Sequence, residues 1–153
     1  MVTDLTTEWR EIGAKPISLD APAGSPVRDD ADFLSMQDEI QKLESMTGEP
    51  VNWKDIVAGG RIVLGEKSKD LLAACYVCLA LLHEEAFQGL AAGLACLHEM
   101  LAHYWDTFYP DAKRVQKRID VLVWLGEKLE AAVGGKSLSP RDLEGGQTCE
   151  VLT

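Results

Sequence analysis

The sequence has no apolar run long enough to cross a membrane. Its longest uninterrupted run, Leu71 to Leu82, has twelve residues, whereas a membrane-spanning helix needs about 20. The N-terminal residues Met1 to Gly13 are acidic and mixed, without the basic and apolar regions of a secretory signal. We therefore expect a cytoplasmic protein without membrane insertion.

Positive charge is also scarce, since 15 Lys and Arg residues face 25 Asp and Glu residues, giving a net charge of −10 and a pI near 4.7. Nucleic acids are bound through basic surfaces, so we expect no nucleic-acid partner. Three of the four cysteines, Cys75, Cys78 and Cys96, lie in apolar helical patterns, where cysteine packs as a small hydrophobic residue. This usage fits a reduced, cytoplasmic protein.

Sequence motifs of catalysis are absent or have the wrong spacing. The sequence contains no glycine-rich phosphate-binding motif and no Gly-x-Ser-x-Gly motif. His98 and His103 are five residues apart, about 140° around a helix. They cannot chelate one ion as the four-residue spacing of zinc proteases allows. We expect no enzymatic activity, no metal and no cofactor.

The spacing of Cys75 and Cys78 leaves one alternative open. Cys-x-x-Cys occurs in redox and zinc sites, but this pair lies inside the most apolar segment without a flanking cation, which favours core packing. The alternative is a small thiol- or metal-dependent helical enzyme that uses Cys75, Cys78, His83 and His98. A further alternative is a free-standing helical self-association domain.

The remaining patterns predict an all-α domain of about five to six helices. No segment alternates convincingly at period two, and apolar residues recur at helical spacing in five segments. These segments run from about residue 30 to 43, from 52 to 63, from 68 to 82, from 87 to 109 and from 111 to 133. Pro16 to Arg28 reads as an extended, proline-rich stretch. We expect one helical domain over residues 1–133 and a flexible tail or start of a linker over 134–153.

Two of these segments are apolar enough to form the centre of the fold: the third, from Leu71, and the fourth. The fourth carries two tracks, a large one (Phe87, Leu90, Leu94, Leu97, Leu101, Tyr104, Phe108) and a small or flexible one (Gly89, Gly93, Cys96, Met100). Small side chains on a helix let another backbone approach. The fifth segment places Val115, Ile119, Leu122, Leu129 and Val133 on one face. Ser68 is the predicted N-cap of the third segment, with Asp70 in its first turn.

A run of four cations, Lys113, Arg114, Lys117 and Arg118, stands in the first turns of the fifth segment. The helix dipole prefers anions at this end. Surface charge runs are usually solvated or paired, so we favour pairing with carboxylates of the same acidic protein. The alternative is a local basic patch that faces a partner.

Several stretches of the sequence resemble, in the right order, the ImpA/TssA N-terminal family of bacterial type VI secretion. They are PISLDAPAGSPVRDDADFLSMQDEI (residues 16–40), VNWKDIV (51–57), SKDL (68–71), FQGLAAGL (87–94), YWDTFYP (104–110) and RIDVLVWL (118–125). Two features depart from the family pattern. Ala86 stands where the family usually has Gly, and the loop after Pro110 is short, with the basic residues Lys113 and Arg114 in place of an acidic stretch.

The resemblance implies a non-enzymatic assembly component in the bacterial cytoplasm. Members of this family sit at the baseplate and the contractile tail sheath, where they help prime, coordinate or cap tube-sheath polymerisation. The implied partners are other baseplate or sheath proteins, together with self-association. Full-length members carry further regions, in many of them a ring-forming C-terminal part, so ring formation does not transfer to this chain.

Two candidate interaction surfaces follow. The first surrounds Ser68, Lys69 and Asp70, where polar residues open a buried helix, and the second surrounds Trp105, Asp106 and Arg118. The basic residues Lys113, Arg114 and Lys117 extend the second surface. At each position we favour a purely structural role over a partner contact: caps for Ser68 and Asp70, core packing for Trp105 and Trp124, and a carboxylate partner for Arg118.

Overall fold

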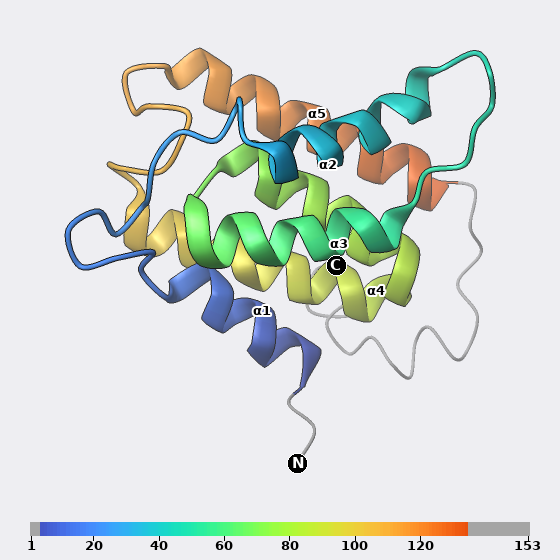
Figure 1. Cartoon of the computed structure of the whole chain (residues 1–153). Helices are drawn as coiled ribbons and strands as arrows, with labels where there is room; N and C mark the ends of the chain where they lie inside the picture. The colour runs from blue at the N-terminus through green and yellow to red at the C-terminus, as the bar shows by residue number, and fades with distance from the viewer. Residues whose placement is uncertain (1–3, 135–153) are drawn as a thin grey trace.

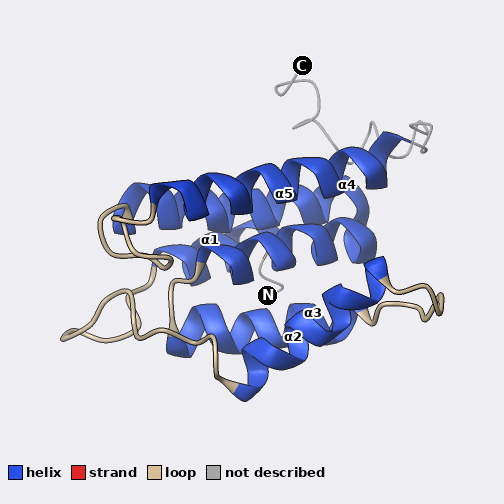
Figure 2. Cartoon of the chain, turned by 90° about the horizontal axis from the view of Figure 1, so that it is seen from above, coloured by secondary structure: helices blue, strands red, loops and turns tan. Residues whose placement is uncertain are grey.

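The computed structural model describes residues 4–134, and within them the chain forms five α-helices and no strand (Figures 1 and 2). The predicted all-α class is confirmed. The helices are α1 (Leu5–Ala14), α2 (Ala31–Gln41), α3 (Trp53–Ile62), α4 (Leu71–Tyr104) and α5 (Val115–Gly134). A 3-10 turn, η1 (Lys42–Glu44), extends α2, and a π-helical turn, η2 (Val63–Lys67), extends α3. Residues 135–153, nearly all of the predicted tail, lie outside the described residues.

Helix α4 is folded back on itself at Ala86, whose φ of 56° and ψ of −143° are not helical. Its halves correspond to the third and fourth predicted segments, although the second half ends at Tyr104 rather than at Tyr109. A Cβ added at Gly89 would overlap the carbonyl oxygen of Leu81, and one added at Gly93 would crowd the backbone of Cys78. The small-residue track therefore brings the two halves into backbone contact, as predicted.

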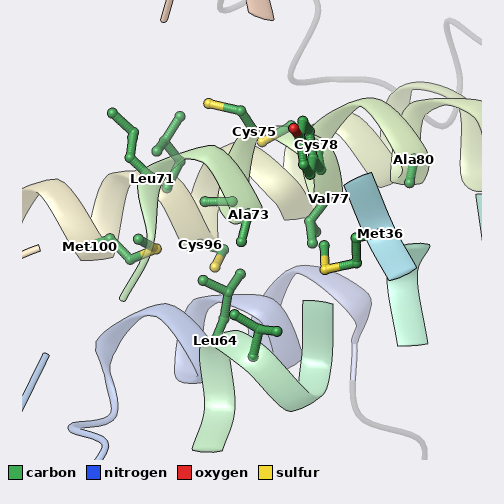
Figure 3. Packing of buried hydrophobic residues seen from close by; sticks show 14 of the residues in the cluster. Met36, Leu64, Leu71, Ala73, Cys75, Val77, Cys78, Ala80, Cys96 and Met100 are labelled. Carbon is green, nitrogen blue, oxygen red and sulfur yellow. The ribbon is translucent and has the colours of Figure 1, made fainter. Parts of the chain in front are cut away.

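The first half of α4 is surrounded by other elements, as its uniform apolarity predicts. Every residue from Ala73 to Leu82 is buried. The cysteines, methionines and aliphatic residues around it form the core (Figure 3). In the second half the small track is buried, whereas Leu90, Leu94 and Leu101 of the large track are only partly buried. Leu97, Tyr104 and Phe108 of the large track are also buried, so both tracks contribute to the core.

Helix α1 lies outside the five predicted segments, although it packs against α4. Trp9 is fully buried, and Gly13 lies against the backbone of Cys96, where a Cβ would overlap the carbonyl oxygen. Leu5 and Ile12 pack partly buried on the same core. The spacing of these four apolar or small residues is helical, but the stretch is short and otherwise polar, so its pattern alone does not predict a helix.

The helices α2 and α3 begin at N-caps of the expected residue type, whereas the N-cap of α4 differs from the predicted one. Asp30 and Asn52 cap α2 and α3, accepting hydrogen bonds from backbone N–H groups of the first turn. The N-cap of α4 is Asp70, which accepts from the N–H of Ala73, so the assignment of this cap to Ser68 was wrong. Both residues are of capping type and stand two positions apart, which is why sequence alone chose incorrectly.

Helix α5 is rotated relative to the predicted face and begins at Val115 rather than near Asp111. Arg118 and Leu125 are its buried residues, whereas Val115, Ile119 and Leu122 of the predicted face are 57%, 46% and 40% exposed. The side chain of Arg118 reaches three carbonyl oxygens of the preceding loop. These contacts tie the Arg118 side of the helix to the fold. The first part of the aliphatic stripe, Val115 to Leu122, faces outward, whereas Leu129 packs partly buried on the core.

Helix α4 is the one described helix long and apolar enough to cross a membrane by length and composition alone. Of its most apolar window, 61% is buried against the rest of the protein. The bend at Ala86 also divides it into two shorter halves. Core helices of soluble proteins pass the same test, so this feature is weak evidence for a membrane span.

Candidate functional site

Three segments far apart in sequence meet beside the start of α4, and we call their meeting place the junction. Residues 23–25 pair with residues 67–69, and residues 69–71 pair with Tyr109, through isolated β-bridges and four backbone hydrogen bonds of 2.7–3.1 Å. In Figures 1 and 2 the loop before α2 and the loop before α5 lie at the same end of the molecule. Three of the stretches that carry the family resemblance thus come together here.

Asp70 is the acidic centre of the junction. One carboxylate oxygen accepts the capping bond from the N–H of Ala73 at 3.0 Å, and the other accepts from Nε of Arg28 at 3.2 Å. Only 1% of the Asp70 side chain is exposed. Burial raises the pKa of Asp70, and the nearby Arg28 guanidinium opposes that rise. The ion pair fixes the proline-rich segment to the N-terminus of α4.

Lys69 is fully buried and forms no ion pair within residues 4–134. Its Nζ donates to the carbonyl oxygen of Ile12 at 2.6 Å and to that of Leu64 at 2.8 Å. The Ile12 carbonyl lies near the C-terminal end of α1, where the helix dipole is negative. At the same end of α1, the hydroxyl of Tyr104 donates to the carbonyl oxygen of Ala14 at 2.6 Å. Burial lowers the pKa of Lys69 to about 8.

Arg118 closes the outer side of the junction. Its guanidinium donates to the carbonyl oxygens of Pro110, Trp105 and Phe108 at 2.7, 2.8 and 2.7 Å. The same group lies 3.6 Å from the centre of the Phe108 ring, a cation–π arrangement. The carbonyl groups on this side of the loop are thereby satisfied by one side chain. The expected carboxylate partner of Arg118 is replaced by backbone oxygens.

A surface cleft of about 530 Å³ opens next to these groups, and we call it the junction cleft. Its lining comes from the proline-rich segment, the start of α4, the loop before α5 and the first turns of α5. The lining residues are Pro26, Arg28, Asp70, Tyr109, Pro110, Asp111, Arg114, Lys117, Asp120 and Val121. The volume is in the range of small-ligand and peptide pockets.

The structure places the predicted surface residues at different depths. Ser68, Lys69 and Asp70 are 0% exposed, so these side chains form no contact surface for a partner. Lys69 and Asp70 hold the junction together from inside by hydrogen bonds, whereas the buried hydroxyl of Ser68 has no hydrogen-bond partner within residues 4–134. Trp105 is 59% exposed, contrary to a core role, and Asp106 is exposed beside it. Trp124, the other tryptophan considered for the core, is partly buried there and meets the ring of Tyr76 edge-on.

The cation run is divided by the fold. Arg118 is buried, whereas Lys113, Arg114 and Lys117 are exposed and form no ion pair with any side chain of residues 4–134. For these three cations the favoured pairing with carboxylates is not present in the described part of the chain. Arg114 and Lys117 line the junction cleft instead.

The three cysteines within residues 4–134 are packed in the core, as predicted. Cys75, Cys78 and Cys96 are free and buried (Figure 3). Burial raises the pKa of Cys75 and of Cys96 to about 12 and raises the pKa of Cys78 well above its ordinary value. Thiols of this kind stay protonated and are poor nucleophiles and poor metal ligands at neutral pH.

The two histidines of the alternative enzyme site, His83 and His98, are exposed, whereas the cysteines of that site are buried. His83 is exposed and stacks on Trp53 with ring centres 4.0 Å apart. Between residues 4 and 134, no group of three or more His, Cys, Asp or Glu side chains is arranged to hold a metal ion. His103 hydrogen-bonds Glu99 one turn earlier, at 2.9 Å.

Most of the cleft residues were not among the predicted site residues, and two of these, Arg28 and Tyr109, help to build the junction. Arg28 supplies the ion pair with Asp70, and Tyr109 supplies the backbone bridge and a hydroxyl bond of 3.3 Å to the carbonyl of Gly24. Both lie in stretches that carry the family resemblance. Arg28 is the one cation of the proline-rich segment, residues 16–28, and this isolated charge was the sequence feature that could have indicated a buried ion pair.

Comparison with known proteins agrees with the resemblance. The sequence matches the family "ImpA, N-terminal, type VI secretion system" over residues 14–127. It is 33% identical over 101 residues to the type VI secretion system component TssA1 of Pseudomonas aeruginosa, a match that covers 61% of this chain and 29% of that protein.

A solved structure has the same fold. It is the N-terminal domain, including the conserved ImpA_N region, of the TssA component of the type VI secretion system from Burkholderia cenocepacia. The TM-score is 0.69 and the identity 26%, over 78% of this chain and 47% of that one. The chain thus spans less than half of either relative. Helix α1 ends where the family match begins.

Proposed function

Because this chain belongs to the ImpA N-terminal family of type VI secretion systems, we propose that it is a non-enzymatic docking module of such a system. In this proposal it contacts baseplate or sheath proteins in the bacterial cytoplasm and helps to prime, coordinate or cap assembly of the tail tube and sheath. The proposal concerns this domain alone, since the chain spans 29% of its curated relative.

The junction cleft is the observation that carries this proposal. Four family-like stretches contribute to its lining, which also includes two side chains that the described fold does not use, Arg114 and Lys117. Protein-recognition sites commonly combine apolar lining residues with polar groups that have no hydrogen-bond partner in the free protein. The exposed Trp105 adds an aromatic side chain of the type enriched at interfaces.

The interior supports a binding role over a chemical one. The three buried thiols are protonated, and the charged groups of the junction, Lys69, Asp70 and Arg118, are each engaged in hydrogen bonds that hold backbone segments together. None of these groups stands free beside a nucleophile with the geometry that catalysis requires. The thiol- or metal-dependent alternative therefore has no supporting arrangement in residues 4–134.

Affinity purification from the bacterium that makes this protein tests the proposal. A tagged copy at native expression level should enrich baseplate or sheath proteins over an untagged strain, and deletion of the gene should reduce the number of sheaths seen by fluorescence microscopy. Normal sheath assembly in the deletion strain, together with no enrichment of either class, would contradict a docking role. Light scattering of the purified domain separates the self-association alternative, which requires a mass that grows with concentration.

A further inference from the structure

The junction cleft has more N–H donors than acceptors without a hydrogen-bond partner in residues 4–134. Arg114 and Lys117 line it and make no side-chain hydrogen bond or ion pair with residues 4–134. Arg28 uses one nitrogen, Nε, for Asp70, and its side chain is 45% exposed. A guanidinium carries five N–H donors and an ammonium three. The cleft therefore offers several cationic donors that nothing in the described fold occupies.

Its acceptors are partly engaged. One oxygen of Asp111 and one of Asp120 make no hydrogen bond within residues 4–134, but these open acceptors are fewer than the open N–H donors. Both carboxylate oxygens of Asp70 are bonded, one to Ala73 and one to Arg28. Asp111 accepts from the N–H of Lys113 at 3.1 Å, and Asp120 accepts from the amide of Gln116 at 2.9 Å. The carbonyl oxygens of Tyr109 and Pro110 accept from Leu71 and Arg118. A ligand that brings acceptors thus finds more open partners than one that brings donors.

The position of the free cations also favours an anionic ligand. Arg114 directly precedes α5, and Lys117 lies in its first turn, where the helix dipole is positive. Cations are unfavourable at this end, and no carboxylate of residues 4–134 lies within ion-pair distance of them, although Asp111 and Asp120 line the same cleft. A bound carboxylate would be attracted by both the side chains and the helix end. Between the charges the lining is apolar, formed by Pro26, Tyr109 and Val121.

We propose that the junction cleft binds an extended acidic segment of a partner protein. Carboxylates of that segment pair with Arg114 and Lys117, the guanidinium by a two-point contact, and an apolar side chain lies on the Pro26, Tyr109 and Val121 floor. The cleft of about 530 Å³ holds a few residues of extended peptide. This inference names the partner chemistry of the proposed docking site and rests on that proposed function.

Fluorescence anisotropy with defined peptides tests the inference. The probe is a fluorescein-labelled peptide of repeated Asp-Leu-Gly units, compared with the isosteric Asn-Leu-Gly peptide and with a Lys-Leu-Gly peptide. The purified chain should bind the acidic peptide at least about tenfold more tightly than the other two, and added salt should weaken that binding. The double variant Arg114→Gln with Lys117→Gln should lose about tenfold in affinity for the acidic peptide.

A matched double variant controls for loss of charge alone. Lys15 and Lys54 are exposed, make no ion pair within residues 4–134 and do not line the cleft. Lys15→Gln with Lys54→Gln should leave acidic-peptide affinity within about twofold of the unmodified chain. Equal binding of all three peptides, no binding of the acidic one, or equal losses in the two double variants would each overturn the inference. Displacement of the acidic peptide by inorganic phosphate at a concentration where sodium chloride has no effect would overturn it in favour of a phosphate site.

The outcome is separable from that of the docking role. Baseplate or sheath proteins that co-purify equally with the chain and with Arg114→Gln/Lys117→Gln leave the proposed function standing and remove the acidic-segment inference. Loss of that co-purification in this variant, with retention in Lys15→Gln/Lys54→Gln, supports both. Absence of any baseplate or sheath partner removes the function, whatever the peptides do.

Discussion

Two adjoining parts of this protein are held together by different means. In the α4 hairpin, two apolar half-helices lie so close that Gly89 and Gly93 have no room for a Cβ against Leu81 and Cys78. In the junction, by contrast, the buried groups are charged, and Lys69, Asp70 and Arg118 hold backbone segments by hydrogen bonds. The hairpin is stabilised by many small contacts of similar size, whereas the junction depends on a few strong ones.

The difference indicates how each part tolerates change. A packed apolar interface loses stability in proportion to the atoms removed or added. A buried charged group that loses its partners leaves polar atoms unsatisfied, and each of these costs about 1–3 kcal/mol. Because the junction also forms one wall of the cleft, a change there should alter both stability and binding, while a change in the hairpin should alter stability alone.

The largest effect is expected for Arg118→Leu. The substitution places an apolar side chain at this buried position and removes three hydrogen bonds of 2.7–2.8 Å to loop carbonyl groups. Because charge-assisted bonds are lost and carbonyl oxygens are left buried, the free energy of unfolding should fall by about 4 kcal/mol. Urea denaturation followed by circular dichroism measures the change.

Arg114→Leu is the matched control for that experiment. It replaces the same residue type one turn earlier, at an exposed position without an ion pair to the described residues, and should change stability by less than about 0.5 kcal/mol. Equal destabilisation by the two variants would mean that the three carbonyl contacts do not hold the loop, and the contrast between junction and surface would fail.

In the hairpin, Gly89→Ala should destabilise by about 3 kcal/mol. The added Cβ would overlap the backbone carbonyl of Leu81, so the two half-helices must separate and lose packing. Gly126→Ala is the matched change in α5, where nothing lies within 4 Å of the added atom. There the higher helix propensity of alanine should raise stability by up to about 1 kcal/mol. If both alanine variants were stabilised, the close contact at Gly89 would be disproved.

These two parts were also unequally predictable from the sequence. The hairpin follows from spacing: both tracks of its second half recur every three or four residues, and Gly89 and Gly93 mark the close approach. Local patterns are sufficient here because the contacts join two half-helices that are close in sequence, and the apolar spacing alone defines both of them. The burial of the cysteines followed for the same reason.

The junction could not be predicted in this way, because its contacts join residues far apart in the chain. Arg28 bonds Asp70 across 42 positions, and Lys69 bonds Ile12 across 57. Polar residues at the start of a buried helix look like caps or surface in a sequence, which is why Ser68, Lys69 and Asp70 were assigned to a contact surface. The rotation of α5 was missed because Arg118, a residue expected at the surface, is its most firmly bonded one.

A smaller effect, and one confined to the junction, is expected from the titration of Lys69. Its pKa is about 8 in the folded protein, against an ordinary value of 10.5. Between these values the unfolded chain holds the proton that the folded chain has lost, so stability rises with pH. From pH 7 to pH 9 the unmodified chain should gain about 1 kcal/mol relative to Lys69→Met.

Comparing the two proteins at each pH isolates this contribution. The cysteines, whose folded pKa values are raised, lower the stability of both proteins at high pH and cancel in the difference. Urea denaturation at pH 7, 8 and 9 supplies the data. If the stability difference between the two proteins stays constant, or shifts in favour of Lys69→Met as the pH rises, the pKa of Lys69 is not lowered in the folded protein.

The last expected effect is a gain in stability at the bend of the hairpin. Ala86 has a positive φ of 56° with a ψ of −143°, a conformation that costs a non-glycine residue about 1–3 kcal/mol. Its side chain is exposed, so few contacts are lost when it is removed. Glycine gains freedom in the unfolded chain, which offsets part of the relief, and Ala86→Gly should therefore stabilise by about 1 kcal/mol. Ala102→Gly, at an exposed and regular helical position of the same α4, should instead destabilise by about 1 kcal/mol. A gain in stability for Ala86→Gly with a loss for Ala102→Gly would show that residue 86 has the non-helical backbone of the bend. Equal losses of stability would mean that α4 continues as a regular helix through residue 86.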